Sequence, residues 1–66
     1  MAIVKVIEVI ASSDKGWEDA ARNGVKEAGK TIKNINSVWV SDQKMVIKNN
    51  EIQEYRVILK VSFEVS

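Results

Sequence analysis

The chain is too short to bury a large hydrophobic core on its own, because it has only 66 residues. A domain of this size hides about 60% of the surface that its unfolded chain exposes, so it needs further support. The usual sources are disulfides, structural metals and association with identical copies. The sequence contains no Cys and no His, which removes disulfides, thiolate sites and the commonest zinc ligand. We therefore expect a single domain over residues 1–66 that forms a homo-oligomer.

The charge pattern argues against two classes of partner. The sequence has ten Lys and Arg residues and nine Asp and Glu residues, and the two signs alternate along the chain. Because no basic block or stripe is present, we expect neither a nucleic-acid nor a membrane partner. The longest apolar stretch, residues 3–11, is interrupted by Lys5 and Glu8 and is unlike a signal-peptide core. We expect a soluble, cytoplasmic protein.

The first half of the chain predicts a strand followed by a helix. Residues 3–12 are dense in β-branched side chains on both faces. From Trp17 to Ile35, apolar residues recur at spacings of three and four, which predicts one amphipathic helix of about five turns. We expect Ser13 to cap its start, Asn34 and Asn36 to form its end, and Trp17 to anchor it to a sheet.

The second half predicts two paired strands. From Ser37 the apolar period changes to two, which puts Ser37, Trp39 and Gln43 on one face and Val38, Val40 and Val46 on the other. Residues 48–51 predict a hairpin turn, because Asn49 and Asn50 tolerate positive φ angles. The last strand covers residues 52–65. Its apolar face consists of Tyr55, Val57, Leu59, Val61, Phe63 and Val65.

These elements predict an α+β fold of the βαββ type, in which one helix lies on a three-stranded, mainly antiparallel sheet. A single helix covers only one face of the sheet. The other face carries Trp39, Ile52 and Ile58 and would remain exposed. An apolar face of this kind favours packing against other copies of the chain.

The order of the segments resembles the dodecin family over essentially the whole chain. The matching stretches are residues 4–13 (VKVIEVIASS), 16–21 (GWEDAA), 28–32 (AGKTI) and 54–63 (EYRVILKVSF). The resemblance implies a sheet wrapped around the helix and a hollow homododecamer with flavin pairs held near its two-fold axes. It also implies storage or shielding of flavin and no catalysis.

The resemblance further implies where flavin would bind. In the family, a tryptophan just after the helix stacks on the flavin ring, and a glutamine after the aromatic residue of the last strand hydrogen-bonds to it. Ungapped matching puts Ser37 and Arg56 at these two positions. The chain therefore departs from the family pattern at both, and the candidate cofactor-binding residues are Ser37, Trp39, Gln43 and Arg56.

Trp39 is the strongest substitute for the missing tryptophan. It lies two residues beyond Ser37, on the same predicted face and displaced by roughly 7 Å. Its indole could stack on a flavin ring, which adds on the order of 1 kcal/mol beyond area burial. It could equally seal a contact between subunits, as interface tryptophans often do. The sequence leaves both interpretations open.

Arg56 and Gln43 each have two interpretations. Arg56 could stack on a ring or bind a flavin phosphate, but we favour pairing with a carboxylate such as Glu54, or Glu64 of a neighbouring subunit. Gln43 could hydrogen-bond a ring edge through its amide, or remain solvated.

The favoured function is a non-enzymatic shell that sequesters FMN or riboflavin. The alternative is a flavin-free shell that binds divalent cations or another small ligand, or serves mainly as an assembly. Single carboxylates such as Glu8, Asp42, Glu51 or Glu54 could form a ring at a symmetry axis, but their spacing requires no metal, and none is predicted. Without His, Cys or a nucleophile and base set, we expect no enzyme.

Overall fold

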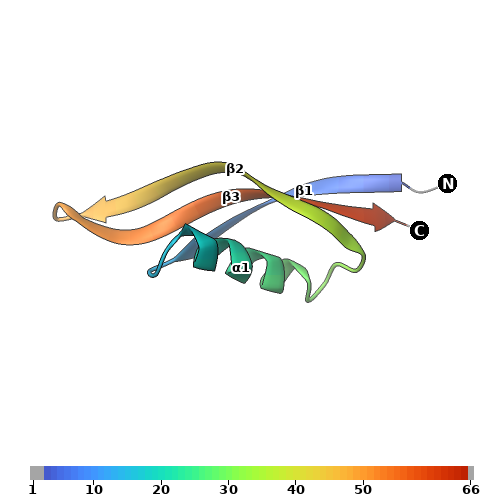
Figure 1. Ribbon diagram of the computed structural model, residues 1–66, viewed down its shortest axis with the longest axis horizontal. Coiled ribbons are helices and arrows are strands. Elements are labelled where there is room, and N and C mark those ends of the chain that lie inside the picture. Colours follow the sequence, from blue (N-terminus) through green and yellow to red (C-terminus); the bar gives the residue numbers. More distant parts are fainter. Residues whose placement is uncertain (1–2, 66) are drawn as a thin grey trace.

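The computed structural model describes residues 3–65, which form the elements β1 (Ile3–Ser13), α1 (Trp17–Ala28), β2 (Ile35–Lys48) and β3 (Glu51–Val65). The three strands form one antiparallel sheet in the order β1-β3-β2. The helix lies along one face of this sheet, and the turn between β2 and β3 projects beyond it (Figure 1). The βαββ fold expected from the sequence is confirmed.

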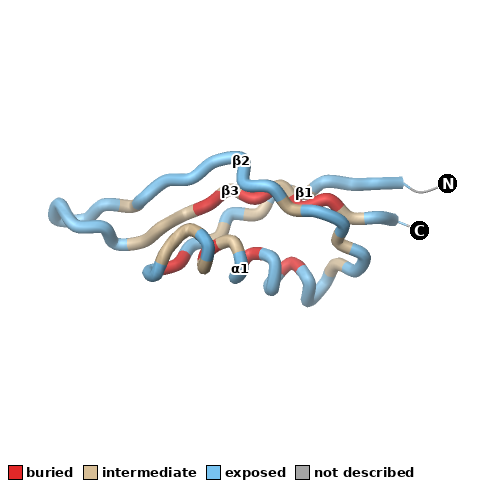
Figure 2. Tube along the Cα trace, viewed as in Figure 1, coloured by how far each residue is buried: buried red, intermediate tan, exposed pale blue. Residues whose placement is uncertain are grey.

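The core lies between α1 and the middle of β3. Val57, Leu59 and Val61 are fully buried beneath Ala20 of the helix. Because β3 pairs with β1 on one side and β2 on the other, its central residues have neighbours on every side except the outer face. Figure 2 shows the buried segments at the centre of β3 and along the facing side of α1. The core is therefore small, as the length of the chain predicts.

Gly24 brings the helix into close contact with the sheet. A methyl group added at its Cα would lie 2.6 Å from Leu59 Cδ1 and 3.1 Å from the Cβ of Ala11. Ala20, Gly24 and Ala28 are the buried residues of α1, and all three are small. The stripe of small residues thus determines how closely helix and sheet pack.

The helix is shorter than the sequence predicts. It ends at Ala28, and tighter hydrogen bonds from Lys30 N to Glu27 O and from Thr31 N to Ala28 O close its last turn. Gly29 weakens the helix at this point. Ile35 belongs to β2, where it lies opposite Phe63, so its place in the apolar period of the helix is coincidental. The prediction that Asn34 and Asn36 end the helix is wrong, although Asn34 does adopt a positive φ of 63° just before β2.

The helix start also differs from the prediction. The N-cap is Gly16, and no side chain caps the helix. Ser13, the expected cap, donates a hydrogen bond of 2.6 Å to Asp19 Oδ2 and accepts one of 3.0 Å from Lys15 N. The Ser13 hydroxyl therefore ties the end of β1 to the first turn of the helix without capping it.

Trp17 anchors the helix to the β2–β3 hairpin, as predicted. Its ring meets Tyr55 edge to face, with ring centroids 5.3 Å apart and an interplanar angle of 76°. Its Nε1 donates a hydrogen bond of 3.2 Å to the carbonyl of Lys44 on β2. Tyr55 itself is half-buried, as is Phe63, because the short helix covers only the middle of β3.

The turn between β2 and β3 is confirmed in detail. Asn49 and Asn50 have φ angles of 54° and 62°, the sign that a type I′ turn requires at both central residues. Lys48 and Glu51 face each other at its base. Among the described residues, no helix has the length and apolar character needed to cross a membrane.

Candidate functional site

The outer face of the sheet, defined here as the face turned away from α1, is the first candidate for a functional surface. Antiparallel pairing puts directly opposite residues on the same face. Glu8, Lys60 and Trp39 are directly opposite one another across β1, β3 and β2, and form one row of this face. Val6, Ser62 and Ser37 form the next row. Trp39 and Ser37 therefore share a face, as the sequence predicts.

Trp39 is the largest exposed side chain on the outer face. The residue is 46% exposed. On β1 the same face carries Val4, Val6 and Ile10, each at least half exposed. Exposed aromatic and aliphatic side chains on one face of a sheet are costly to leave in water. Within one subunit, this surface is open to a flat ligand or to another protein surface.

Ser37 is held by a pair of hydroxyl groups. Its Oγ lies 2.7 Å from the Oγ of Ser62, and Ser62 Oγ also donates to the carbonyl of Ser37 at 3.3 Å. Ser62 is buried even though it faces outward. The position therefore offers a small polar contact whose hydrogen bonds are already made within the chain, and no surface for stacking.

Arg56 pairs with Glu54 of its own chain. Its Nε donates a hydrogen bond of 3.1 Å to Glu54 Oε1, and its Nη2 contacts the same oxygen. The favoured interpretation of Arg56 as the partner of a carboxylate is confirmed, and the carboxylate comes from the same subunit. A small hollow of about 50 Å³ beside it is lined by Asp42, Gln43, Lys44, Arg56 and Ile58. The hollow is far too small for a flavin ring.

Comparison with known proteins gives the family. The sequence model of the dodecin family matches residues 3–66. This chain belongs to the dodecin family. It is 34% identical over 64 residues to the calcium dodecin of Mycobacterium tuberculosis, covering 97% of this chain and 90% of that protein. It is 28% identical over 61 residues to the dodecin of Thermus thermophilus, covering 92% and 88%.

Solved dodecin structures share the fold. Dodecin from Streptomyces davaonensis superimposes with a TM-score of 0.93 at 25% identity, over 98% of this chain and 96% of that chain. The structure described as the calcium chelating antigen calcium dodecin of Mycobacterium tuberculosis superimposes with a TM-score of 0.87 at 33% identity, over 97% and 91%. The dodecin fold is therefore complete in the described residues.

Gln43 does not lie where the sequence analysis put it. A bulge at Ser41 shifts the register of β2 between Val40 and Asp42, so Gln43 lies opposite the buried residue Val57. It therefore belongs to the face of α1, and the expectation that it shares the face of Trp39 is wrong. The same shift moves Val46 to the outer face, opposite Glu54. The sequence contains a weak signal of this bulge. In a regular strand, residues on one face are an even number of positions apart, whereas the apolar residues Val40 and Met45 share the face of α1 and are five positions apart.

A groove between α1 and β2 is a feature that the sequence analysis missed. It has a volume of about 450 Å³. Its apolar lining consists of Ala21, Val25, Val38, Val40 and Leu59, and its rim carries Glu18, Arg22 and Lys26. The sequence signal for it is weak, because Val25 and Val40 read as ordinary core positions. In the structure both remain exposed, at 38% and 45%.

The described residues contain no group of three or more His, Cys, Asp and Glu side chains placed to hold a metal ion. Two of the carboxylates considered for a shared cation site already have partners, because Asp42 accepts a hydrogen bond from Gln43 N and Glu54 binds Arg56. Glu27 has a lowered pKa, because Lys30 hydrogen-bonds to it and brings a positive charge close to it. That pair lies at the end of α1, away from the outer face.

Proposed function

We propose that this protein is a non-enzymatic, homododecameric shell that sequesters a flavin, FMN or riboflavin, against Trp39 between subunits. The exposed indole of Trp39 on the outer face is the observation that carries the proposal. The dodecin family and the 66-residue length support the shell, because a chain this short gains stability by covering its exposed face with identical neighbours.

The described residues fit a flavin at Trp39 better than at the two family positions. Ser37 is bonded to Ser62 and offers no flat surface, and Arg56 is held by Glu54. The indole of Trp39, by contrast, is accessible on an outer face that also carries exposed aliphatic side chains on β1. Lys60, directly opposite Trp39, brings a positive charge to the same row and suits the phosphate of FMN.

In this role the protein orients the ring and excludes water, and a bound flavin would supply its own colour and redox chemistry. Stacking on Trp39 would hold the isoalloxazine ring, and a second subunit would close the pocket over it. The absence of His and Cys from the sequence is consistent with storage, because neither a general base near neutral pH nor a thiol nucleophile is available.

The test is a titration of FMN and riboflavin followed by flavin emission. Stacking on indole should quench the emission of the bound flavin in the parent protein. Trp39→Ala should weaken binding about tenfold or more, because it removes the stacking surface. Gln43→Ala is the matched control and should bind as the parent does, since Gln43 lies on the opposite face. Full flavin emission with the parent protein, or unchanged quenching with Trp39→Ala, contradicts the proposal.

A second function is favoured by one comparison. The relative that is 34% identical to this chain is a calcium dodecin. A shell that binds divalent cations would use one carboxylate from each of several subunits at a symmetry axis. Calorimetric titration with calcium tests it, and the absence of heat at millimolar concentration removes it. Native mass spectrometry of freshly purified protein would report the number of subunits and any retained ligand together.

A further inference from the structure

Lys60 lies at the centre of the row that holds Trp39, on the middle strand of the sheet. It is directly opposite Glu8 on β1 and directly opposite Trp39 on β2. Directly opposite residues have Cβ atoms about 4.5–5.5 Å apart, so the long side chain of Lys60 can bring its ammonium beside a ligand stacked on the indole. Lys60 is half-buried, and a lysine in such a position packs its aliphatic stem against its neighbours and keeps its charge at the surface.

The charge of Lys60 remains available to a ligand. Within residues 3–65, its ammonium forms no ion pair, although Glu8 is directly opposite. Arg56, which lies four residues earlier on the same face of β3, is by contrast held by Glu54. Lys60 is therefore the positive charge that an anionic ligand stacked on Trp39 would meet.

Two carboxylates limit how strongly this surface attracts an anion. Glu8 is exposed and shares the row of Lys60. Asp42 lies in the neighbouring row, opposite Ile58, and its Oδ1 already accepts a hydrogen bond from Gln43 N. Because the energy between two charges falls with distance, an anion in direct contact with the Lys60 ammonium gains more than it loses to carboxylates further away. A neutral ligand gains nothing from this contact.

We infer that Lys60 makes the Trp39 site select the phosphorylated flavin, FMN, over riboflavin, and that Glu8 competes with the phosphate for Lys60. The two flavins share the ring that stacks on Trp39 and differ only in the phosphate at the end of the ribityl chain. A phosphate monoester carries a charge of about −1.5 to −2 near pH 7, so it forms a charge-assisted contact with an ammonium. This role of Lys60 rests on the flavin function proposed above.

The ratio of the affinities for FMN and riboflavin tests the inference, and flavin emission measures both. We expect the parent protein to bind FMN about tenfold more tightly than riboflavin, because only FMN makes the charged contact. Lys60→Met removes the charge at similar side-chain length and should bring the ratio close to one. Lys60→Arg keeps the charge and should retain the preference for FMN. An unchanged ratio in folded Lys60→Met overturns the inference.

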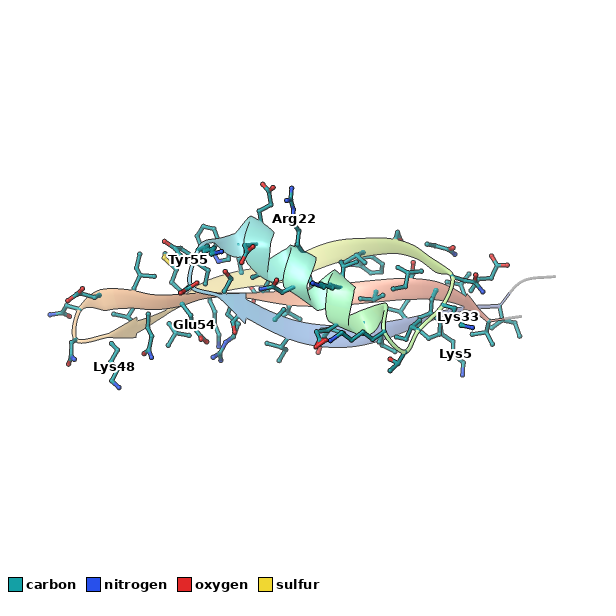
Figure 3. The ribbon with its side chains drawn as sticks, turned by 90° about the horizontal axis from the view of Figure 1, so that it is seen from below. Lys5, Arg22, Lys33, Lys48, Glu54 and Tyr55 are labelled. Atoms are coloured by element: carbon teal, nitrogen blue, oxygen red, sulfur yellow. The ribbon has the colours of Figure 1, made fainter. Side chains whose placement is uncertain are left out.

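Lys5→Met is the matched control, because it makes the same change of net charge on the other face of the sheet. Lys5 is exposed and lies opposite Phe63, which belongs to the apolar face turned toward α1. Figure 3 shows Lys5 at the same end of the molecule as Lys33, in the loop after α1, and away from Lys48 near the hairpin turn. Its preference for FMN should stay within about twofold of the parent value. An equal loss in Lys5→Met and Lys60→Met would mean that net charge selects FMN, which overturns the role of Lys60.

Two further measurements decide the question if Lys60→Met fails to fold. In the parent protein, added sodium chloride should weaken FMN binding and bring the ratio closer to one, since salt screens charges at an exposed site. Glu8→Gln should raise the ratio roughly threefold, because it removes the competing carboxylate. Equal affinities of the parent protein for both flavins, with quenching that still depends on Trp39, overturn this inference alone. Full emission of both flavins in the presence of the parent protein overturns the proposed flavin function as well.

Discussion

At the scale of single residues, Gly24 has the clearest energetic role. Replacing a helical glycine by alanine normally stabilises a helix by about 1 kcal/mol. Here the added methyl would meet Leu59, which is fully buried, and the Cβ of Ala11. Overpacking of a filled core costs about 1–3 kcal/mol, which exceeds the gain in helix propensity. We expect Gly24→Ala to lower the free energy of unfolding by about 1 kcal/mol, measured by urea denaturation.

Gly16 provides the matched control for Gly24. No atom lies within 4 Å of the position that its Cβ would occupy, and its φ of 165° is extended backbone open to any residue. Gly16→Ala should therefore leave the free energy of unfolding almost unchanged. If Gly24→Ala proves stabilising, the close contact between helix and sheet relaxes more easily than we infer.

At the scale of elements, the turn between β2 and β3 sets the register of the hairpin arm. Asn49 and Asn50 both adopt positive φ. This backbone conformation has no steric cost for glycine and costs about 1–2 kcal/mol for alanine. We expect Asn50→Gly to raise the midpoint of thermal unfolding slightly and Asn50→Ala to lower it. Both can be measured by calorimetry at one protein concentration. Equal effects of the two substitutions would mean that the backbone angle of Asn50 does not limit stability.

At the scale of the whole molecule, the exposed aliphatic residues of the outer face link folding to assembly. Val4, Val6 and Ile10 on this face are each at least half exposed in the single subunit. Burial of these side chains by other copies would stabilise the fold by mass action, so we expect the midpoint of thermal unfolding to rise with protein concentration.

Val6→Lys should disrupt this assembly. It places a charge among the aliphatic side chains of the outer face, and burying an unpaired charge is costly. Sedimentation velocity should show smaller species than the parent protein forms, whereas Thr31→Lys, at an exposed loop position, should sediment as the parent does. A stable, compact single subunit of the parent protein at micromolar concentration would contradict the inference that assembly covers the outer face and stabilises the fold.

Local sequence signals were enough to predict the order of the elements, the hairpin turn, the anchoring role of Trp17 and the outward position of Trp39. Each depends on a local preference or on strict alternation over a few residues. The asparagines at the turn, for example, are among the few residues that accept positive φ. The dodecin resemblance also rests on short stretches in a fixed order, which the family model then matched.

The points at which strand alternation and the helical period stop depend on contacts between distant parts of the chain. The bulge at Ser41 puts Gln43 on the face of the helix, and pairing with Phe63 draws Ile35 into β2, so the helix ends at Ala28. Ser13 bonds to Asp19 instead of capping the helix. In each case the outcome depends on contacts with β3 or α1, residues distant in sequence, whose summed packing energy outweighs the local preference.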